Sequence, residues 1–238
     1  MGDVAVVTGT DRGLGNAIAG NLLEHGWTVV GGHLDRIAPE LNESSGRYVP
    51  LQVDVGNDYS VRAFGTEVKK HVGVVDVIIN NAAILGTPTV ENAIRDGLDY
   101  QKMLETINVN SAGPLRVVEA LLPMMHEKGR RRLCFVSSEA GSVTRSWRDN
   151  YYCYCMSKSA LNMGVSILFK DLRKDGFTFR VYHPGYIRSY MLGQKNLEAT
   201  LEPEEAAELA LSYFLSAEGS VDEDRLAMRD FEGQEWPW

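Results

Sequence analysis

Short apolar runs rich in β-branched residues alternate with longer segments of helical periodicity along this chain. The apolar runs predict strands over residues 4–8, 28–32, 48–53, 74–80, 132–136, 178–182 and, as a last candidate, 225–229. The periodic segments predict helices over residues 13–25, 60–71, 98–125, 154–174 and 203–215. Strands that are apolar on both faces and separated by helices are typical of a parallel sheet covered on both sides. We therefore expect an α/β fold with a doubly wound parallel sheet.

Length, charge and cysteine content narrow the class of protein further. No Pro/Gly/Ser-rich linker divides the 238 residues, so we expect one domain over 1–238. The net charge of −8 argues against nucleic acid as the main partner, and the basic run at 130–132 is interpreted as a solvated turn. No apolar run reaches the roughly 18–20 residues of a membrane span, and the first residues lack a signal-peptide charge pattern. The three cysteines have no metal-ligand spacing and indicate reduced thiols in a cytoplasmic protein without a metal site.

A glycine-rich turn, Thr8-Gly9-Thr10-Asp11-Arg12-Gly13-Leu14-Gly15, follows the first expected strand and leads into a helix. Glycines let the backbone turn tightly and approach a pyrophosphate, and the free N–H groups at the helix start hold the anion. A glycine cluster alone also marks ordinary loops, but the strand–turn–helix context favours a dinucleotide. The residues of this turn expected to bind a cofactor are Gly9, Asp11, Arg12, Gly13, Leu14 and Gly15.

The spacing Gly-x-x-x-Gly-x-Gly resembles the short-chain dehydrogenase/reductase family, and further motifs follow in the family's order. Asp54-Val55 resembles the adenine-binding pair, and Asn80-Asn81-Ala82-Ala83 resembles the Asn-Asn-Ala-Gly turn with Ala83 in place of Gly. Pro184-Gly185-Tyr186-Ile187-Arg188-Ser189 resembles the segment beside the nicotinamide. The resemblance implies a Rossmann-type fold and a small carbonyl or alcohol substrate. It also implies cofactor contacts from Asp54, Val55, Asn81, Ala82, Ala83, Tyr154, Lys158, Pro184, Gly185, Ile187 and Ser189.

Four polar residues match the catalytic set of that family. Tyr154 and Lys158 are four residues apart, which puts both on one face of the expected helix. Ser138 follows the fifth expected strand, and Asn110 matches the family's helix Asn, with Asn108 as its nearest rival. The resemblance implies that Tyr154 donates a proton to the carbonyl oxygen that Ser138 holds. It implies that Lys158 lowers the pKa of Tyr154 and binds the nicotinamide ribose. Asn110 would anchor a water that relays protons to Lys158.

The Tyr154 hydroxyl is expected to titrate near neutrality. Free Tyr has a pKa near ~10, which is too high for efficient acid–base work at neutral pH. An ammonium ~4 Å away stabilises the phenolate by about 4 kcal/mol at an effective dielectric of ~20, or roughly three pKa units before desolvation opposes it.

Tyr151 is a rival acid, because it lies seven residues before Lys158, the spacing of enoyl-reductase relatives. Seven residues is two helical turns, so Tyr151 shares the face of Lys158 if the helix begins early enough. Those relatives usually carry a Ser in place of a late Gly of the phosphate turn. The presence of Gly13 and Gly15 here favours Tyr154.

The choice of cofactor depends on the end of the second expected strand. NAD recognition usually needs a carboxylate on the ribose hydroxyl there, and His33 occupies that position. Asp35 and Arg36 lie just beyond it. Arg12 stands where NADP-preferring members carry a basic residue, and a guanidinium suits a phosphate in charge and geometry. We expect NADP(H), with NAD(H) as the alternative if Asp35 reaches the ribose.

The last part of the chain is expected to shape the substrate site and the assembly. The segment at about 189–202 is expected to cover the substrate. The aromatic tail, 231–238, resembles those of the C-factor and sniffer-type carbonyl reductases and should need a partner surface. In most relatives the helices carrying Asn110 and Tyr154 serve as dimer faces, so the resemblance implies a homodimer or homotetramer.

Our interpretation is an NADP(H)-dependent oxidoreductase that moves a hydride between the cofactor and a carbonyl or alcohol. A dinucleotide-sensing regulator with vestigial catalysis is the alternative from another class, although a sensor needs only the phosphate turn. An NAD-dependent alcohol dehydrogenase is a further alternative. A sugar epimerase or dehydratase usually has a C-terminal substrate domain for which the residues after Ser189 leave little room.

Overall fold

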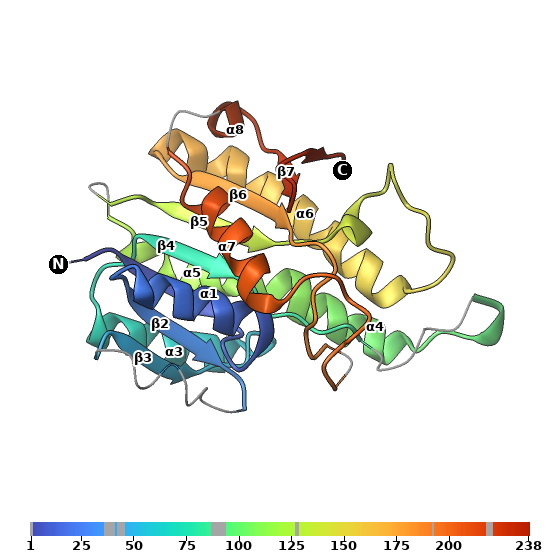
Figure 1. Cartoon of the computed structure of the whole chain (residues 1–238), viewed down its shortest axis with the longest axis horizontal. Helices are drawn as coiled ribbons and strands as arrows, with labels where there is room; N and C mark the ends of the chain where they lie inside the picture. The colour runs from blue at the N-terminus through green and yellow to red at the C-terminus, as the bar shows by residue number, and fades with distance from the viewer. Residues whose placement is uncertain are drawn as a thin grey trace.

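The computed structural model describes residues 2–35, 41, 46–86, 94–126, 129–191, 193–217 and 221–238. Within these ranges eight strands form one sheet in the order β3-β2-β1-β4-β5-β6-β7-β8 (Figure 1). Their bounds are Val4–Thr8 for β1, Thr28–His33 for β2, Tyr48–Gln52 for β3, Val77–Asn80 for β4, Arg132–Val136 for β5, Thr178–His183 for β6, Met228–Asp230 for β7 and Glu235–Trp236 for β8. All neighbouring strands pair in parallel except β7 and β8, which are antiparallel. The expected doubly wound α/β fold is confirmed.

Helices cover both faces of the sheet (Figure 1). On one face α1 (Gly13–Glu24) and α7 (Pro203–Phe214) bury Ile18 and Phe214 against the strands. On the other face lie α3 (Asp58–His71), α5 (Gly113–Leu121) and α6 (Tyr152–Leu172). α4 (Tyr100–Ile107) packs against α6, and α8 (Val221–Asp224) is a single turn. No helix in the described part of the chain has both the length and the apolar character needed to cross a membrane.

The long helical stretch expected at 98–125 is interrupted. α4 passes into a π-turn, η2 (Asn108–Ala112), before α5 begins at Gly113, and α5 ends in a 3₁₀ turn over Leu122–Met124. Pro114 lies in the first turn of α5 and has no N–H to continue the ladder of α4. Single π-turns inside helices often occur at functional sites.

Two expectations about the surface are corrected. The basic run at 130–132 is not a solvated turn throughout, because Arg132 is the first residue of β5 and only 1% exposed. Its guanidinium donates to the carbonyl oxygens of Phe214 and Ser216 at the end of α7. The last strand expected at 225–229 is β7, which begins at Met228 and is joined by β8, a strand that the pattern did not indicate.

Strand order reverses between β1 and β4, which are neighbours in the sheet although β2 and β3 separate them in the chain. In open α/β sheets ligands bind beyond the carboxyl ends of the strands at such a switch point. The phosphate turn follows β1, and the Asn-Asn turn follows β4. The fold therefore brings these two motifs together at one edge of the sheet.

Candidate active site

A cleft of about 1470 Å³ opens at the carboxyl ends of the strands, beside the switch point. Its walls come from the loops after β1 to β6 and from the tail. The expected cofactor residues that line it are Gly9, Asp11, Arg12, Gly13, Leu14, Asp54, Val55, Asn81, Ala82, Ala83, Tyr154, Lys158, Pro184, Gly185, Ile187 and Ser189. Gly15 and His33 do not line it. One cleft thus collects motifs that lie far apart in the sequence.

The phosphate turn has the shape of an anion cradle. α1 begins at Gly13 after Arg12, whose side chain does not cap the helix, so the first N–H groups remain available to a ligand. Gly9 has a φ of +75°, and a Cβ added there would lie 2.9 Å from Asn81 Nδ2. A Cβ at Gly15 would overlap the Gly9 carbonyl oxygen, so Gly15 serves the close packing of the turn rather than the cleft wall. A pyrophosphate fits this arrangement of donors.

Asn81 joins the two loops of the switch point. Its Nδ2 donates to the carbonyl oxygen of Thr8 at 2.9 Å and to that of Gly9 at 3.3 Å. The main-chain N–H groups of Asn81 and Ala82 both donate to Thr8 Oγ1 at 3.1 Å. The Asn-Asn turn therefore supports the phosphate turn, in addition to lining the cleft.

At the ribose end of the cleft, Leu34 and Asp35 form the wall in place of the expected His33. His33 is the last residue of β2 and is 8% exposed, whereas Leu34 and Asp35 line the cleft. The carboxylate of Asp11 accepts hydrogen bonds from the N–H groups of both Leu34 and Asp35 at 3.0 Å. The buried His33 is therefore not part of the cleft wall, and the expectation that it contacts the cofactor is not supported by its position. Arg36 lies outside the described residues.

Arg12 is exposed at the mouth of the cleft. Its guanidinium lies 5.7 Å from the centroid of the Tyr190 ring. It makes no ion pair with any carboxylate that the structure describes. Its charge is therefore available to an anionic ligand.

Ser138, Tyr154 and Lys158 meet at the other end of the cleft. Lys158 is buried on α6, and its Nζ donates to the carbonyl oxygen of Val136 at 2.9 Å. The same Nζ lies 5.6 Å from the centroid of the Tyr154 ring. Ser138 follows β5 and caps a short turn, with its Oγ accepting from the N–H of Ala140 at 3.1 Å.

The expected direction of the Tyr154 pKa is wrong for this structure. Burial raises the pKa of Tyr154 to about 12, and a hydrogen bond with Ser138 offsets only part of that shift. Burial also lowers the pKa of Lys158 to about 8, since an ammonium loses hydration inside the protein. Desolvation is the largest cause of both pKa shifts. The phenol stays protonated at neutral pH.

Asn110 lies behind the cleft rather than in its wall. Its side chain is fully buried and bonds both the N–H and the C=O of Ile84 at 2.8 Å. Its Nδ2 also donates to Ser157 Oγ at 2.9 Å, next to Lys158. The rival Asn108 bonds the carbonyl oxygen of Gly56 at 2.8 Å instead. The geometry brings Asn110, and not Asn108, toward Lys158.

Tyr151 lines the cleft but stands outside α6. It has a left-handed conformation with a φ of 61°, and the helix begins at Tyr152. Tyr151 is the N-cap of α6, and its carbonyl oxygen accepts from the N–H of Cys155 at 3.0 Å, but its own backbone is not helical, so its side chain does not continue the helix face that carries Lys158. The geometry favours Tyr154.

Sequence reasoning missed the groups at the substrate end. Arg148 forms a two-pronged ion pair with Glu139 at 2.7 and 2.5 Å, directly after Ser138. His183 and Trp236 also line the cleft, with ring centroids 5.6 Å apart. Glu139 lies in a short 3₁₀ turn and Arg148 in an irregular loop nine residues later, so no periodic signal joins them.

The aromatic tail finds a surface on its own chain. The guanidinium of Arg145 lies 4.7 Å from the centroid of the Trp236 ring. The N–H of Thr144 donates to the carbonyl oxygen of Trp238 at 3.1 Å. These contacts fasten the tail to the loop after β5, beside the cleft.

Comparison with known proteins supports the same grouping. A family model described as short chain dehydrogenase matches residues 3–200. The C-signal protein of Myxococcus xanthus is 37% identical over 178 residues, which is 75% of this chain and 100% of that protein. The carbonyl reductase Sniffer of D. melanogaster has the same fold, with a TM-score of 0.86, 21% identity and full coverage of both chains. An NADPH-bound carbonyl reductase from chicken fatty liver has a TM-score of 0.84 and 23% identity, over 100% of this chain and 99% of the other.

These matches confirm the resemblance drawn from the motifs, including its C-factor and sniffer-type branch. The matched residues contain the phosphate turn, Ser138, Tyr154 and Lys158, all of which meet in the cleft. The chain belongs to the short-chain dehydrogenase/reductase family of oxidoreductases.

Proposed function

We propose that this chain is an NADP(H)-dependent carbonyl reductase, with Tyr154 as acid/base. The observation that carries this proposal is the meeting of an anion cradle and of Ser138, Tyr154 and Lys158 at opposite ends of one cleft. A bound NADPH supplies the hydride. The chain's own residues hold the substrate oxygen and supply the proton.

The protonation states support reduction. A phenol with a pKa of about 12 is protonated at neutral pH and is ready to donate to the oxygen of a carbonyl as negative charge develops there. Ser138 bonds the phenol and stands beside the same oxygen, so it orients both. Lys158, with a pKa of about 8, keeps most of its charge at pH 7 and stabilises the phenolate that donation leaves.

Asn110 has a supporting role in this proposal. Its bonds to Ile84 and Ser157 fix the wall of the cleft and the turn of α6 that carries Lys158. A relayed proton would reach Lys158 through a water anchored at this point. A dinucleotide sensor needs only the phosphate turn and would not require Asn110 to anchor a water next to Lys158.

We assign NADP(H) rather than NAD(H) because Arg12 offers an available guanidinium at the ribose end. The competing group is Asp35, which also lines the cleft and suits a free ribose hydroxyl. NADP or NADPH is bound in several structures with this fold, among them a short-chain dehydrogenase/reductase of Burkholderia multivorans at a TM-score of 0.83. That likeness agrees with the assignment from Arg12.

The substrate is a small carbonyl compound in this proposal. The segment 189–202 supplies Tyr190, Met191 and Thr200 to the cleft wall and covers the substrate. Leu192, which belongs to the same segment, lies outside the described residues. The three cysteines form no disulfide with one another, and we propose a cytoplasmic location, where thiols stay reduced.

Assembly follows from an apolar stripe on α6. Met156, Met163 and Ile167 are 45%, 63% and 61% exposed on this helix, and Tyr100 and Leu104 of the adjacent α4 are each 64% exposed. Covering these side chains with a second copy would remove apolar area from water. We propose a homodimer or homotetramer of single-domain subunits.

A screen of ketones, aldehydes and diketones against NADPH and NADH oxidation tests the function. We expect turnover with NADPH, loss of it in Tyr154→Phe with cofactor affinity retained, and turnover that survives in Tyr151→Phe. If Tyr151→Phe loses turnover while Tyr154→Phe keeps it, the acid is misassigned. Tight cofactor binding without turnover of any carbonyl favours the sensor alternative.

A further inference from the structure

The π-turn η2 carries two asparagines that reach in different directions. Asn110 binds Ile84 and Ser157 behind the reacting end of the cleft. Asn108 binds the carbonyl oxygen of Gly56 in the loop after β3. A single turn of backbone therefore touches both ends of the proposed cofactor site.

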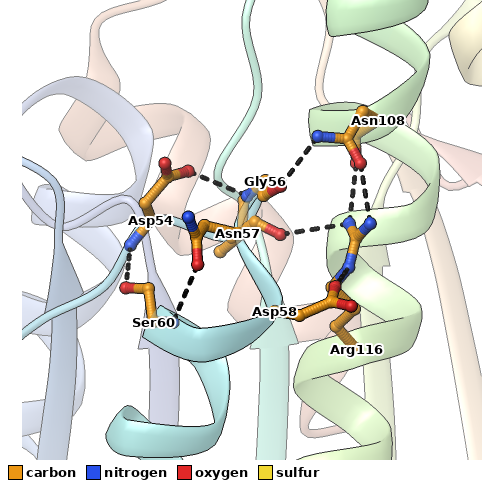
Figure 2. A network of polar contacts seen from close by, with 8 residues as sticks. Asp54, Gly56, Asn57, Asp58, Ser60, Asn108 and Arg116 are labelled. Atoms are coloured by element: carbon orange, nitrogen blue, oxygen red, sulfur yellow. Dashed lines mark hydrogen bonds and ion pairs between the residues drawn. The ribbon is translucent and has the colours of Figure 1, made fainter.

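Arg116, two helical turns further along, holds this π-turn (Figure 2). Its Nη2 donates to Asn108 Oδ1 at 2.7 Å, and its Nη1 to the carbonyl oxygen of Asn108 at 3.2 Å and to that of Val55 at 3.4 Å. Its Nε donates to the carboxylate of Asp58 at the start of α3. The planar fork adds a second donor to the Asn108 carbonyl oxygen, which already accepts from the N–H of Gly113, and it also binds the loop after β3.

The loop after β3 has hydrogen bonds of its own. The N–H of Gly56 donates to Asp54 Oδ1 at 2.9 Å, and the N–H of Asp54 donates to Ser60 Oγ at 2.9 Å (Figure 2). A Cβ added at Gly56 would lie 3.2 Å from Asn108 Nδ2, and one at Gly113 would lie 3.0 Å from Val55 Cγ2. Loop and helix are therefore in close contact at Gly56 and at Gly113.

Both partners of this contact border the cleft. Asp54, Val55, Gly56 and Asn108 line it at the end where the adenosine would bind. Ile84, which Asn110 holds by both main-chain groups, lines it as well. A ligand that contacts the loop after β3 is therefore linked, through Asn108 and Arg116, to the π-turn that carries Asn110.

We propose that Arg116 and Asn108 are positioning residues that couple binding of the adenosine half of the cofactor to the placement of Asn110 and Ile84. The inference rests on the proposed function, in which Asp54 to Gly56 bind adenosine. Coupling of this kind is reciprocal and typically amounts to about 5–150-fold in an equilibrium constant. Neither residue touches the reacting atoms.

The first test uses adenosine 2′,5′-bisphosphate, which carries the adenosine half alone. Hydrogen exchange is followed at the amides of Gly56 and Ile84, whose N–H groups bond Asp54 and Asn110. We expect the ligand to slow exchange at both amides in the wild type, by about fivefold or more at Ile84. In Arg116→Leu the ligand should still slow Gly56 but no longer Ile84.

Arg62→Leu is the matched control, because it removes an exposed arginine of α3. It should behave as the wild type. Equal protection of Ile84 in Arg116→Leu and in the wild type overturns the coupling. Failure of the bisphosphate to bind the wild type overturns the proposed cofactor site, and the coupling with it. If Arg116→Leu does not fold, Asn108→Ala replaces it and should lose the same protection.

The second test is a double-mutant cycle on turnover with saturating NADPH. If Arg116 acts through Asn110, Arg116→Leu lowers kcat about 5-fold or more in the wild type and less than about 2-fold in the Asn110→Ala background. Multiplicative losses mean that Arg116 acts on the fold in general, and this outcome overturns the coupling. The cycle separates a positioning role from loss of stability, which the free energy of unfolding reports independently.

Discussion

The Nζ of Lys158 lies 5.6 Å from the centroid of the Tyr154 ring, with Lys158 buried on α6 and Tyr154 half-buried in the wall of the cleft. Burial lowers the pKa of Lys158 to about 8 and raises that of Tyr154 to about 12. Each group is therefore in an environment that opposes its charge. At neutral pH only Lys158 lowers the stability of the fold, because its ammonium is charged there, whereas Tyr154 is neutral in both the folded and the unfolded chain.

Replacing the buried ammonium should stabilise the protein while stopping turnover. A pKa of about 8 against the ordinary 10.5 corresponds to about 3 kcal/mol, and loss of the Val136 bond returns about 1 kcal/mol. We expect Lys158→Met to raise the free energy of unfolding at pH 7 by about 2 kcal/mol. Urea unfolding measures it, and Lys170→Met, on the exposed side of the same helix, is the control.

The same change has a defined pH dependence. Between pH 8 and pH 10.5 the unfolded chain binds more protons at Lys158 than the folded protein does, so wild-type stability rises with pH in this window. The advantage of Lys158→Met should shrink by about 2 kcal/mol between pH 7 and pH 9.5. An advantage that is constant over this window would contradict a lowered pKa.

Arg12 should decide the choice of cofactor. A charge-assisted contact to the 2′-phosphate is worth about 1.5–3 kcal/mol, or about ten- to a hundredfold in affinity. Arg12→Ala should therefore weaken NADPH by that factor and leave NADH nearly unchanged. Titration of both cofactors into both proteins measures this. Equal losses, or a wild type that prefers NADH, would assign the choice to Asp35, and Asp35→Asn would then shift it.

Glu223 should be essential for stability. Its Oε1 lies 2.6 Å from Arg180 Nη2 and 3.7 Å from Arg132 Nη2, and the two arginine side chains are 0% and 1% exposed. Glu223→Ala leaves two buried guanidinium charges without this carboxylate, which should cost about 3–5 kcal/mol. Urea unfolding at low and high salt checks it, since a buried pair is screened little. Glu208 is an exposed residue of α7, so Glu208→Ala should change the free energy of unfolding little. A similarly small change for Glu223→Ala would refute the argument.

The stripe on α6 should hold the assembly together. Two carboxylates in place of Met163 and Ile167, which are 63% and 61% exposed, would have to be desolvated in an interface. Light scattering at micromolar concentration should show a dimer or tetramer for the wild type and a monomer for Met163→Glu/Ile167→Glu. Tyr59 lies on α3 and is 84% exposed, so Tyr59→Glu should leave the assembly intact and serves as the control. A monomeric wild type would remove the proposal.

Local patterns predicted most of the frame because their causes are local. The apolar runs and helical periods place β1, β5 and β6 at the expected residues, since burial on both faces dictates composition. The short strand β8 was not predicted, because two residues are too few to show an alternation of apolar and polar positions. Only their pairing with β7 makes them a strand. The interruption of the helix at Asn108–Ala112 was not predicted either, although Pro114 stands within the stretch that was expected to be helical.

The candidate site shows the same division. The order of the motifs was enough to name Ser138, Tyr154 and Lys158, because each is tied to the end of a strand or the start of a helix. The rivalry between Asn110 and Asn108 needed the partners of each, Ser157 and Gly56, which lie far away in the chain. The same holds for Tyr151, whose left-handed backbone leaves it just outside the first residue of α6.

By itself, the sequence determined the parallel sheet, the phosphate turn and the family, because periodicity and motif spacing are properties of contiguous residues. Only the tertiary structure decided that His33 does not line the cleft, that Glu139 pairs with Arg148, and that burial raises the pKa of Tyr154. Each of these depends on burial and on partners from separate loops. The desolvation of the Tyr154 phenol depends on all the groups packed around it. These groups come from separate parts of the chain, so the spacing of residues along the sequence does not reveal it.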